Sequence, residues 1–221
     1  MKRAFPLFAL LWFVFATWGL ELGVAFVYKT FAGSLTSLPP TTRLEMLWTI
    51  TILRALAVAI LLRWLGLNWR ELFAGRFGAR ELALSTAVVL AFLLLELVYS
   101  GWEYTPQAIG EFRYYLSLSG GRESLAAVLF ASQYAYYFVE ILAVNLLYAG
   151  SLRLAGERAA VVAPTLLWGF AHAINGIAMP LQQAVLLGLY VGLFAFAMYG
   201  LCFKSKSMKV PLYIWFANLA V

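Results

Sequence analysis

The sequence predicts an all-α fold, a polytopic membrane helix bundle, and three observations support this prediction. Of the 221 residues, 64% are hydrophobic and only 12% are charged, against about 45–50% and about 25% in a typical soluble domain. Apolar runs recur at about 20 residues, the length that crosses a hydrocarbon layer of about 30 Å. The eight Trp and the aromatic content of 17% suit the interface belts of a bilayer. A soluble enzyme is therefore excluded, and the lipid bilayer is the expected surrounding.

Six full membrane spans and a shorter seventh segment are expected in chain order. They lie at 5–28, 45–67, 81–102, 124–150, 159–178, 181–202 and 207–221. Met1 to Arg3 is basic, like the start of a signal peptide, but the following run is too long and lacks a small-residue cleavage site. It is therefore interpreted as a span. Because no repeat or low-complexity tract interrupts the spans, residues 1–221 are interpreted as one membrane domain.

The positions of the Lys and Arg residues indicate the topology. With the N-terminus inside, eleven of them fall in inner segments and four, Lys29, Arg43, Arg113 and Arg122, in outer ones. Inner loops of membrane proteins hold such an excess. The sequence therefore predicts a multi-pass protein of the cell membrane with a cytoplasmic N-terminus. The net charge of +6 is explained by topology, and no nucleic-acid partner is expected.

Three charged residues fall inside the first three spans. Placing an ionisable group there costs at least about 2.5–3.5 kcal/mol, so each such group needs an explanation. Glu21 and Arg54 lie about 10 and 13 Å from the outer ends of their spans at about 1.5 Å per residue. Glu96 lies six residues from the outer end of the third span. These similar depths predict a structural charge cluster of the three side chains.

A second polar group is expected deeper in the bundle. Glu140 has Tyr136 and Tyr137 one turn before it and no cation within a turn, which is typical of a carboxylate that acts as a general base. His172, the only His in the sequence, and Asn218 fall at similar depth, about 18 and 16 Å from the inner boundary against about 15 Å for Glu140. Taken singly, each is better explained by a structural role: His172 as a core histidine that donates to a carbonyl across a helix interface, and Asn218 as an interhelical hydrogen-bonding group. Together, a deep Glu and the only His at matching depth raise the possibility of a site.

Metal and cofactor chemistry is not expected. The sequence contains one His, one Cys and no Asp among its ten acidic residues. Structural and catalytic zinc sites draw mainly on His and Cys ligands. The predicted site therefore uses side chains alone, with no metal and no cofactor.

Three stretches of the second half carry a resemblance to a known family. Residues 167–172 read Leu-Trp-Gly-Phe-Ala-His, 187–192 read Leu-Gly-Leu-Tyr-Val-Gly, and 211–218 read Pro-Leu-Tyr-Ile-Trp-Phe-Ala-Asn. With Glu140 before them, residues 124–221 resemble the core of the CAAX-protease and bacteriocin-processing (ABI) family of intramembrane endopeptidases. The resemblance implies that Glu140 and His172 activate a water for attack on a peptide bond, and that Asn218 stabilises the oxyanion. The glycines at 188 and 192 also form a small-xxx-small pattern, which predicts close helix packing.

The chain departs from the family pattern at three positions. Val139 replaces one member of a Glu pair, Val144 replaces an Arg, and Ile214 replaces a second His. Loss of one oxyanion donor typically costs about 10²–10³ in rate. The candidate supporting groups are Asn175, Gln133, Tyr137 and Tyr136. In its compactness and eroded motifs the chain is similar to the archaeomyxosortase and myxosortase branch, which implies a membrane-anchored protein tail as substrate.

Three functions remain open on the sequence alone. The first is hydrolysis of a protein tail by water activated at Glu140 and His172. The second is a non-catalytic family member that binds a membrane protein, favoured by the departures at 139, 144 and 214. The third is proton-coupled transport through the buried acidic groups, although the chain lacks the internal repeat of many transporters.

Overall fold

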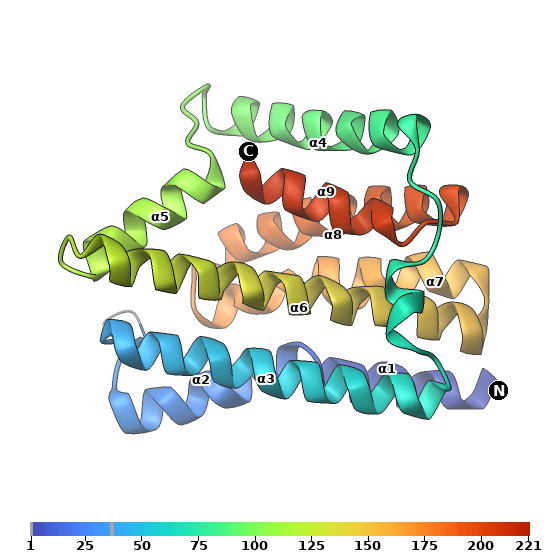
Figure 1. Cartoon of the computed structure of the whole chain (residues 1–221), viewed down its shortest axis with the longest axis horizontal. Helices are drawn as coiled ribbons and strands as arrows, with labels where there is room; N and C mark the ends of the chain where they lie inside the picture. The colour runs from blue at the N-terminus through green and yellow to red at the C-terminus, as the bar shows by residue number, and fades with distance from the viewer. Residues whose placement is uncertain (1, 36–37) are drawn as a thin grey trace.

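The computed structural model describes residues 2–35 and 38–221, and every regular element in these ranges is a helix (Figure 1). The α-helices are α1 Phe5–Phe15, α2 Trp18–Ala32, α3 Pro40–Leu65, α4 Ala79–Tyr99, α5 Gln107–Leu118, α6 Glu123–Ala155, α7 Glu157–Pro164, α8 Leu181–Ser205 and α9 Lys209–Ala220. Shorter helical turns are η1 Lys2–Ala4, η3 Trp69–Phe73, η4 Thr165–Gly169 and η5 Phe170–Ile177. The protein is an all-α polytopic helix bundle, as predicted.

Within the described ranges, six helical segments are long and apolar enough to cross a membrane. They are Phe5–Ala32, Pro40–Leu65, Ala79–Tyr99, Glu123–Ala155, Glu157–Ile177 and Leu181–Ser205. The six predicted full spans are thereby confirmed as helices, with ends shifted by up to five residues. The seventh segment is α9, whose 12 residues are too few to cross a bilayer. Between the third and fourth predicted spans, Gln107–Leu118 folds into the short helix α5.

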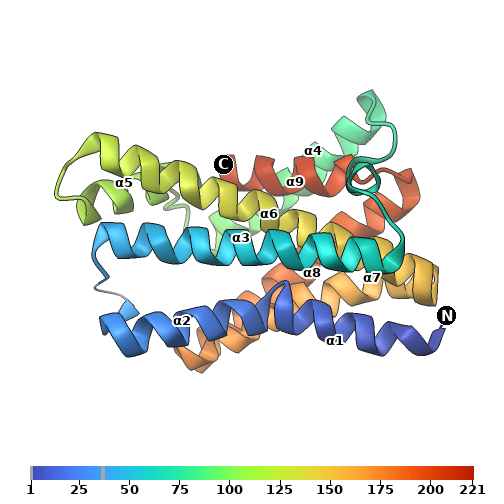
Figure 2. The same cartoon turned by 60° about the horizontal axis from the view of Figure 1, so that its bottom comes forward.

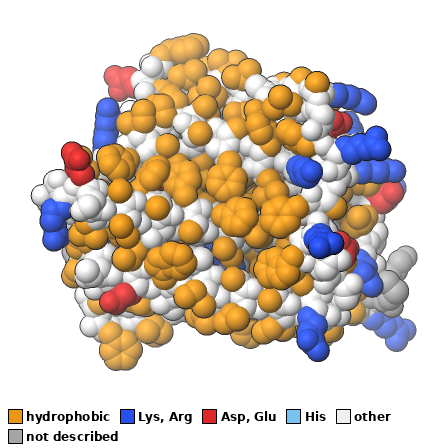
Figure 3. All heavy atoms as spheres, in the orientation of Figure 1, with side chains coloured by type: hydrophobic (Ala, Val, Ile, Leu, Met, Phe, Trp, Pro, Cys, Tyr) orange, Lys and Arg blue, Asp and Glu red, His pale blue; other side chains and the backbone are white. Residues whose placement is uncertain are grey.

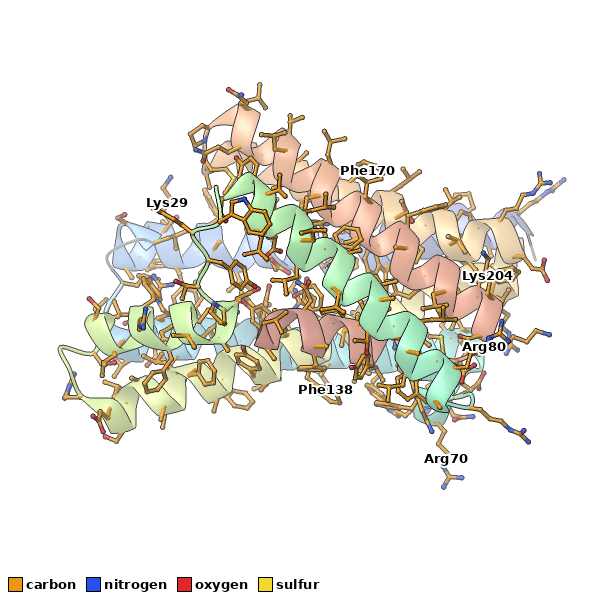
Figure 4. All side chains as sticks on the ribbon, turned by 90° about the horizontal axis from the view of Figure 1, so that it is seen from above. Lys29, Arg70, Arg80, Phe138, Phe170 and Lys204 are labelled. Carbon is orange, nitrogen blue, oxygen red and sulfur yellow. The ribbon has the colours of Figure 1, made fainter. Side chains whose placement is uncertain are left out.

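Charge divides the two ends of the bundle. Lys and Arg gather mostly at one end, while apolar side chains cover the middle of the visible face (Figure 3). Arg70, Arg80 and Lys204 extend from this basic end, and Lys29 lies at the opposite end (Figure 4). The predicted inner and outer segments therefore fall at opposite ends of the bundle.

The first span is not one continuous helix. It breaks between α1 and α2, where Thr17 has φ −144° and ψ −108°. Figure 2 shows α1 and α2 in succession along one edge of the bundle, beside α3. Ala16 and Thr17 are buried, so the backbone groups that the break releases need partners inside the protein. The Ala16 carbonyl has one, because it accepts a hydrogen bond from Arg54 Nε of α3 at 2.9 Å.

The fifth span changes its helix type along its length. It begins as α7, becomes a π-helical turn in η4 and ends as the 3₁₀-helical η5. Pro164 ends the α-helical part, since proline cannot donate an N–H and crowds the preceding turn. Such changes of helix type often mark functional segments. Here Trp168 lies in the π-helical turn and His172 in the 3₁₀-helical part.

Helix α6 is the centre of the bundle and packs against α1, α3, α5, α7 and α9. Its segment from Glu140 to Tyr148, about two and a half turns, is buried on every face. Asn145 lies in this segment and donates from Nδ2 to the Leu72 carbonyl at 3.1 Å, while Tyr199 Oη donates to Asn145 Oδ1 at 3.0 Å. This buried network fixes the linker between α3 and α4 to the core.

Candidate functional site

One large cavity of about 1240 Å³ lies among α2, α3, α4, α5, α6, η5, α8 and α9. Its walls are apolar for the most part, with polar side chains concentrated in the same space. The polar and charged residues that line it are Glu21, Lys29, Arg43, Glu96, Gln107, Gln133, Tyr136, Tyr137, Glu140, His172, Asn175, Tyr190 and Asn218. All seven residues predicted for the active site therefore surround a single space, although they come from three separate segments.

Glu140 enters the cavity from the middle of α6. Its side chain is 8% exposed, and its Oε1 accepts a hydrogen bond from Trp168 Nε1 at 2.8 Å. A hydrogen bond to a carboxylate is among the stronger kinds in proteins and fixes its geometry. In the sequence, Trp168 stands out only as a member of the stretch 167–172. Its indole N–H is in fact the direct partner of Glu140.

His172 is oriented by the irregular segment that carries it. Its Nδ1 lies 2.8 Å from the Trp168 carbonyl oxygen and 3.2 Å from the Gly169 carbonyl oxygen. Because carbonyl oxygens only accept, Nδ1 carries a proton and Nε2 is the ring nitrogen left to act. The rings of Trp18 and Trp168 stand edge-on to the imidazole, with centroids at 5.0 and 5.4 Å. The ring is therefore fixed on two sides.

Asn218 reaches the cavity from α9 and lies beside Tyr190 of α8. The Tyr190 hydroxyl donates to the carboxylate of Glu96 from α4. This bond corrects the predicted charge cluster: Glu96 lines the cavity, but its hydrogen-bond partner is Tyr190 rather than Arg54. The reason is that α4 packs against α8 and α9, on the side of the cavity away from α3.

The other two members of the predicted charge cluster do pair. Arg54 is fully buried, and its Nη2 forms the ion pair with the carboxylate of Glu21. The guanidinium also lies over the ring of Tyr136, 4.5 Å from its centroid. Tyr136 precedes Glu140 by one turn of α6, so the pair adjoins the base rather than lying apart from it.

The other supporting residues stand toward the end of the cavity next to α5. Tyr137 Oη donates to Glu111 of α5, and Tyr115 Oη donates to Gln133 Oε1 at 2.8 Å. Gln133 thus accepts with its carbonyl oxygen, and its side chain also lies beside the Tyr137 hydroxyl. Burial raises the pKa of the Tyr115 phenol to about 12, so this donor keeps its proton at neutral pH. Asn175 of η5 also lines the cavity.

Two glycines of α8 allow the backbone of η5 to pack closely against this helix. A Cβ built on Gly188 would lie 2.9 Å from the backbone nitrogen of Ala173 and the backbone oxygen of Phe170. A Cβ on Gly192 would lie 2.7 Å from the Phe170 ring. Figure 4 shows Phe170 against α8. The packing role predicted for the glycine pattern is confirmed, and the segment packed there is the one that carries His172.

The structure also adds residues that the sequence did not single out for the site. Lys29 and Arg43 line the cavity, although they entered the sequence analysis only as outer charges. Arg54 adjoins the site from another span, which no local spacing could reveal. Ile214, where the resemblance expects a His, is fully buried in the core and offers the cavity no donor.

Comparison of this chain with family models, curated proteins and solved structures finds no match.

Proposed function

We propose that this protein is an intramembrane endopeptidase of the cell membrane that hydrolyses a peptide bond in a membrane-anchored protein tail. In this proposal it is a divergent member of the CAAX-protease and ABI family, near the archaeomyxosortase and myxosortase branch. One observation carries the proposal. Glu140, His172 and Asn218 come from α6, η5 and α9, and they line one cavity between membrane-spanning helices.

The chemistry assigned to these residues is general-base hydrolysis. Glu140, held by Trp168, takes a proton from a water whose oxygen then bonds to the scissile carbonyl carbon. His172 Nε2 accepts from the same water and orients it. The Asn218 amide donates to the oxyanion that forms on the carbonyl oxygen. Collapse of this intermediate breaks the C–N bond, and the proton on Glu140 passes to the leaving amine.

The walls of the cavity favour a substrate that comes from the bilayer. Phe26 and Ile177 are 70% and 72% exposed, and both line the cavity together with Leu22. An apolar segment can lie against these side chains while its backbone reaches the polar groups inside. Gln133 and Asn175 supply further amide donors for that backbone, in place of the histidine that Ile214 replaces.

The test is a mass-spectrometric comparison of membrane-protein C-termini in cells with and without the protein. Glu140→Gln and His172→Ala should each abolish any processing that depends on the wild-type chain, while the protein remains folded and in the membrane. Glu45→Gln is the matched control, because Glu45 is an exposed residue at the start of α3 and should leave processing unchanged. Processing that persists in Glu140→Gln would refute the assignment of the base.

A non-catalytic binding role is the second candidate, and the burial of Ile214 favours it. Without a donor from that position, the cavity has fewer groups for the oxyanion than the resemblance expects. This role predicts an uncleaved membrane protein that copurifies with the chain equally well in wild type and Glu140→Gln. A processed substrate that requires Glu140 would exclude it.

A further inference from the structure

Two cations lie at the outer end of the cavity, which is the end opposite the basic end of the bundle. Lys29 near the end of α2 and Arg43 at the start of α3 both line the cavity. Figure 4 shows Lys29 at the end away from Arg70 and Lys204. Topology explains the Lys and Arg residues of the basic end. It does not explain two cations that line one cavity at the other end.

Arg43 is held in place and still has a donor without a partner. Its Nη2 donates to the Leu35 carbonyl at 2.9 Å, and its guanidinium lies over the ring of Tyr114, 5.5 Å from the centroid. Its Nε is buried and has no hydrogen-bond partner in the described part of the chain. Buried donors of this kind are uncommon in folded proteins, and each one needs an explanation.

The described carboxylates do not neutralise these two cations. Neither Lys29 nor Arg43 forms an ion pair in the part of the chain that the structure describes. Glu111 of α5 accepts from Tyr137 instead. An unpaired guanidinium or ammonium group beside an apolar cavity attracts a carboxylate or a phosphate. The outer mouth of the cavity therefore suits an anionic group that a ligand brings.

The packing of α3 on α6 gives the depth of Glu140 below this mouth. The two helices run in the same direction (Figure 1), and Trp48 Nε1 of α3 donates to Ser132 Oγ of α6 at 3.1 Å. Arg43 precedes Trp48 by five residues, and Glu140 follows Ser132 by eight. At about 1.5 Å per residue, Arg43 and Glu140 are therefore separated by about 20 Å along the helices. An extended backbone covers this distance in about six residues.

We propose that Lys29 and Arg43 form a subsite for an acidic side chain of the substrate, on the outer side of the scissile bond and about six residues from it. The cations then decide which end of the bound tail faces outward and how far the tail reaches into the cavity. The residues between the acidic side chain and the scissile bond are apolar, because they lie against wall side chains such as Phe26. The inference rests on the proposed function for the scissile bond, but its test measures binding alone.

The experiment measures peptide binding to the full-length Glu140→Gln chain in nanodiscs of phosphatidylcholine, so that cleavage does not consume the probe. The probes share one apolar segment of about 20 residues and carry either glutamates or glutamines at one end, with each peptide made in both chain directions. The glutamate peptide should bind about tenfold more tightly in one direction, the effect of one hydrogen bond between charged groups. Arg43→Gln should remove most of this preference. Arg113→Gln is the matched control, because Arg113 is an exposed cation of α5 outside the cavity walls and should keep the preference.

Arg43→Glu supplies a test that a folding defect does not imitate. This variant should prefer a third peptide that carries lysines in place of the glutamates, whereas a misfolded chain should bind none of the three. Equal binding of the glutamate and glutamine peptides by the parent chain would refute the subsite. The same holds for a preference that persists in both Arg43→Gln and Lys29→Gln, or that disappears equally in Arg113→Gln.

A lipid phosphate is the other anion that could reach these cations, and a second set of nanodiscs distinguishes it. Phosphatidylglycerol should leave the peptide preference in place. If this lipid instead copurifies with the chain through Arg43 and removes the preference, the cations bind a headgroup and the assignment to a substrate side chain is wrong. Failure of the proposed proteolysis would show separately, as processing in cells that continues in Glu140→Gln.

Discussion

Replacement of Gly188 by Ala tests how η5, the segment that carries His172, is held in place. The glycine lies where α8 meets the backbone of η5. An added Cβ would lie 2.9 Å from Ala173 N and Phe170 O, whereas ordinary contacts begin at 3.4 Å. Both neighbours are backbone atoms, so no side chain can rotate away. The segment must therefore withdraw from α8 by about half an ångström.

The magnitude follows from a comparison with Gly200 in the same helix. A Cβ on Gly200 would meet nothing within 4 Å, and both substitutions gain about 1 kcal/mol in helix propensity. Overpacking of a close contact costs about 1–3 kcal/mol. The difference between the two variants is therefore about 1–3 kcal/mol, which corresponds to about 2–12 °C in melting temperature for a chain of this size.

The assay is thermal unfolding of wild type and both variants in the same detergent. Unfolding is monitored by tryptophan fluorescence, and the monodispersity of each sample is measured after heating. Gly188→Ala should melt below wild type or near it, and Gly200→Ala at wild type or above it. If the two variants melt at the same temperature, η5 is not held by close approach to α8, and the account of how His172 is placed is wrong.

Three further outcomes follow from contacts of single side chains. Trp168→Phe removes the donor to Glu140 and should lower the free energy of unfolding by about 1.5–3 kcal/mol. Trp215→Phe is the matched control. The Nε1 of Trp215 has no hydrogen-bond partner in the described ranges, so this substitution should lower the free energy of unfolding by less. Asn145→Ala leaves a linker carbonyl and a tyrosine hydroxyl unpaired in the core and should cost about 1–3 kcal/mol in the same measurement. Since burial raises the pKa of Tyr115 to about 12 from 10, its contribution to stability is present below pH 10 and is lost as pH rises through 12. In a pH series of melting temperatures, the fall at alkaline pH should therefore be smaller in Tyr115→Phe than in wild type.

Hydrophobic length and charge placement were sufficient to predict the helices of the spans. Runs of about 20 apolar residues have few alternatives to a membrane helix, because every backbone group must be satisfied within the segment. The two interruptions of these helices could not be predicted, because they depend on groups outside their own segments. The break at Thr17 and the change of helix type after Pro164 are stabilised by partners from other spans, among them Arg54 and the glycines of α8.

The candidate site divides in a similar way. Its members could be chosen from the sequence because polar groups are rare in apolar spans, and depth along each helix put Glu140, His172 and Asn218 near one level. The depth of a residue along its helix does not say toward which neighbouring helix its side chain points. The hydrogen-bond and ion-pair partners of these residues could therefore not be predicted. Glu96 has the right depth for Arg54 and yet bonds to Tyr190, while Trp168, an apolar residue by composition, provides the donor to Glu140.

The sequence by itself determined that this protein is a bundle of membrane-spanning helices, where its basic end lies and which few polar side chains stand inside it. These properties follow from length, hydropathy and charge, which act along the chain. Only the tertiary structure decided which of those side chains share a cavity and which pair with one another, because that depends on how each helix faces its neighbours. The pairing of Glu21 with Arg54 beside Glu140 joins three helices, and no pattern within one helix specifies it.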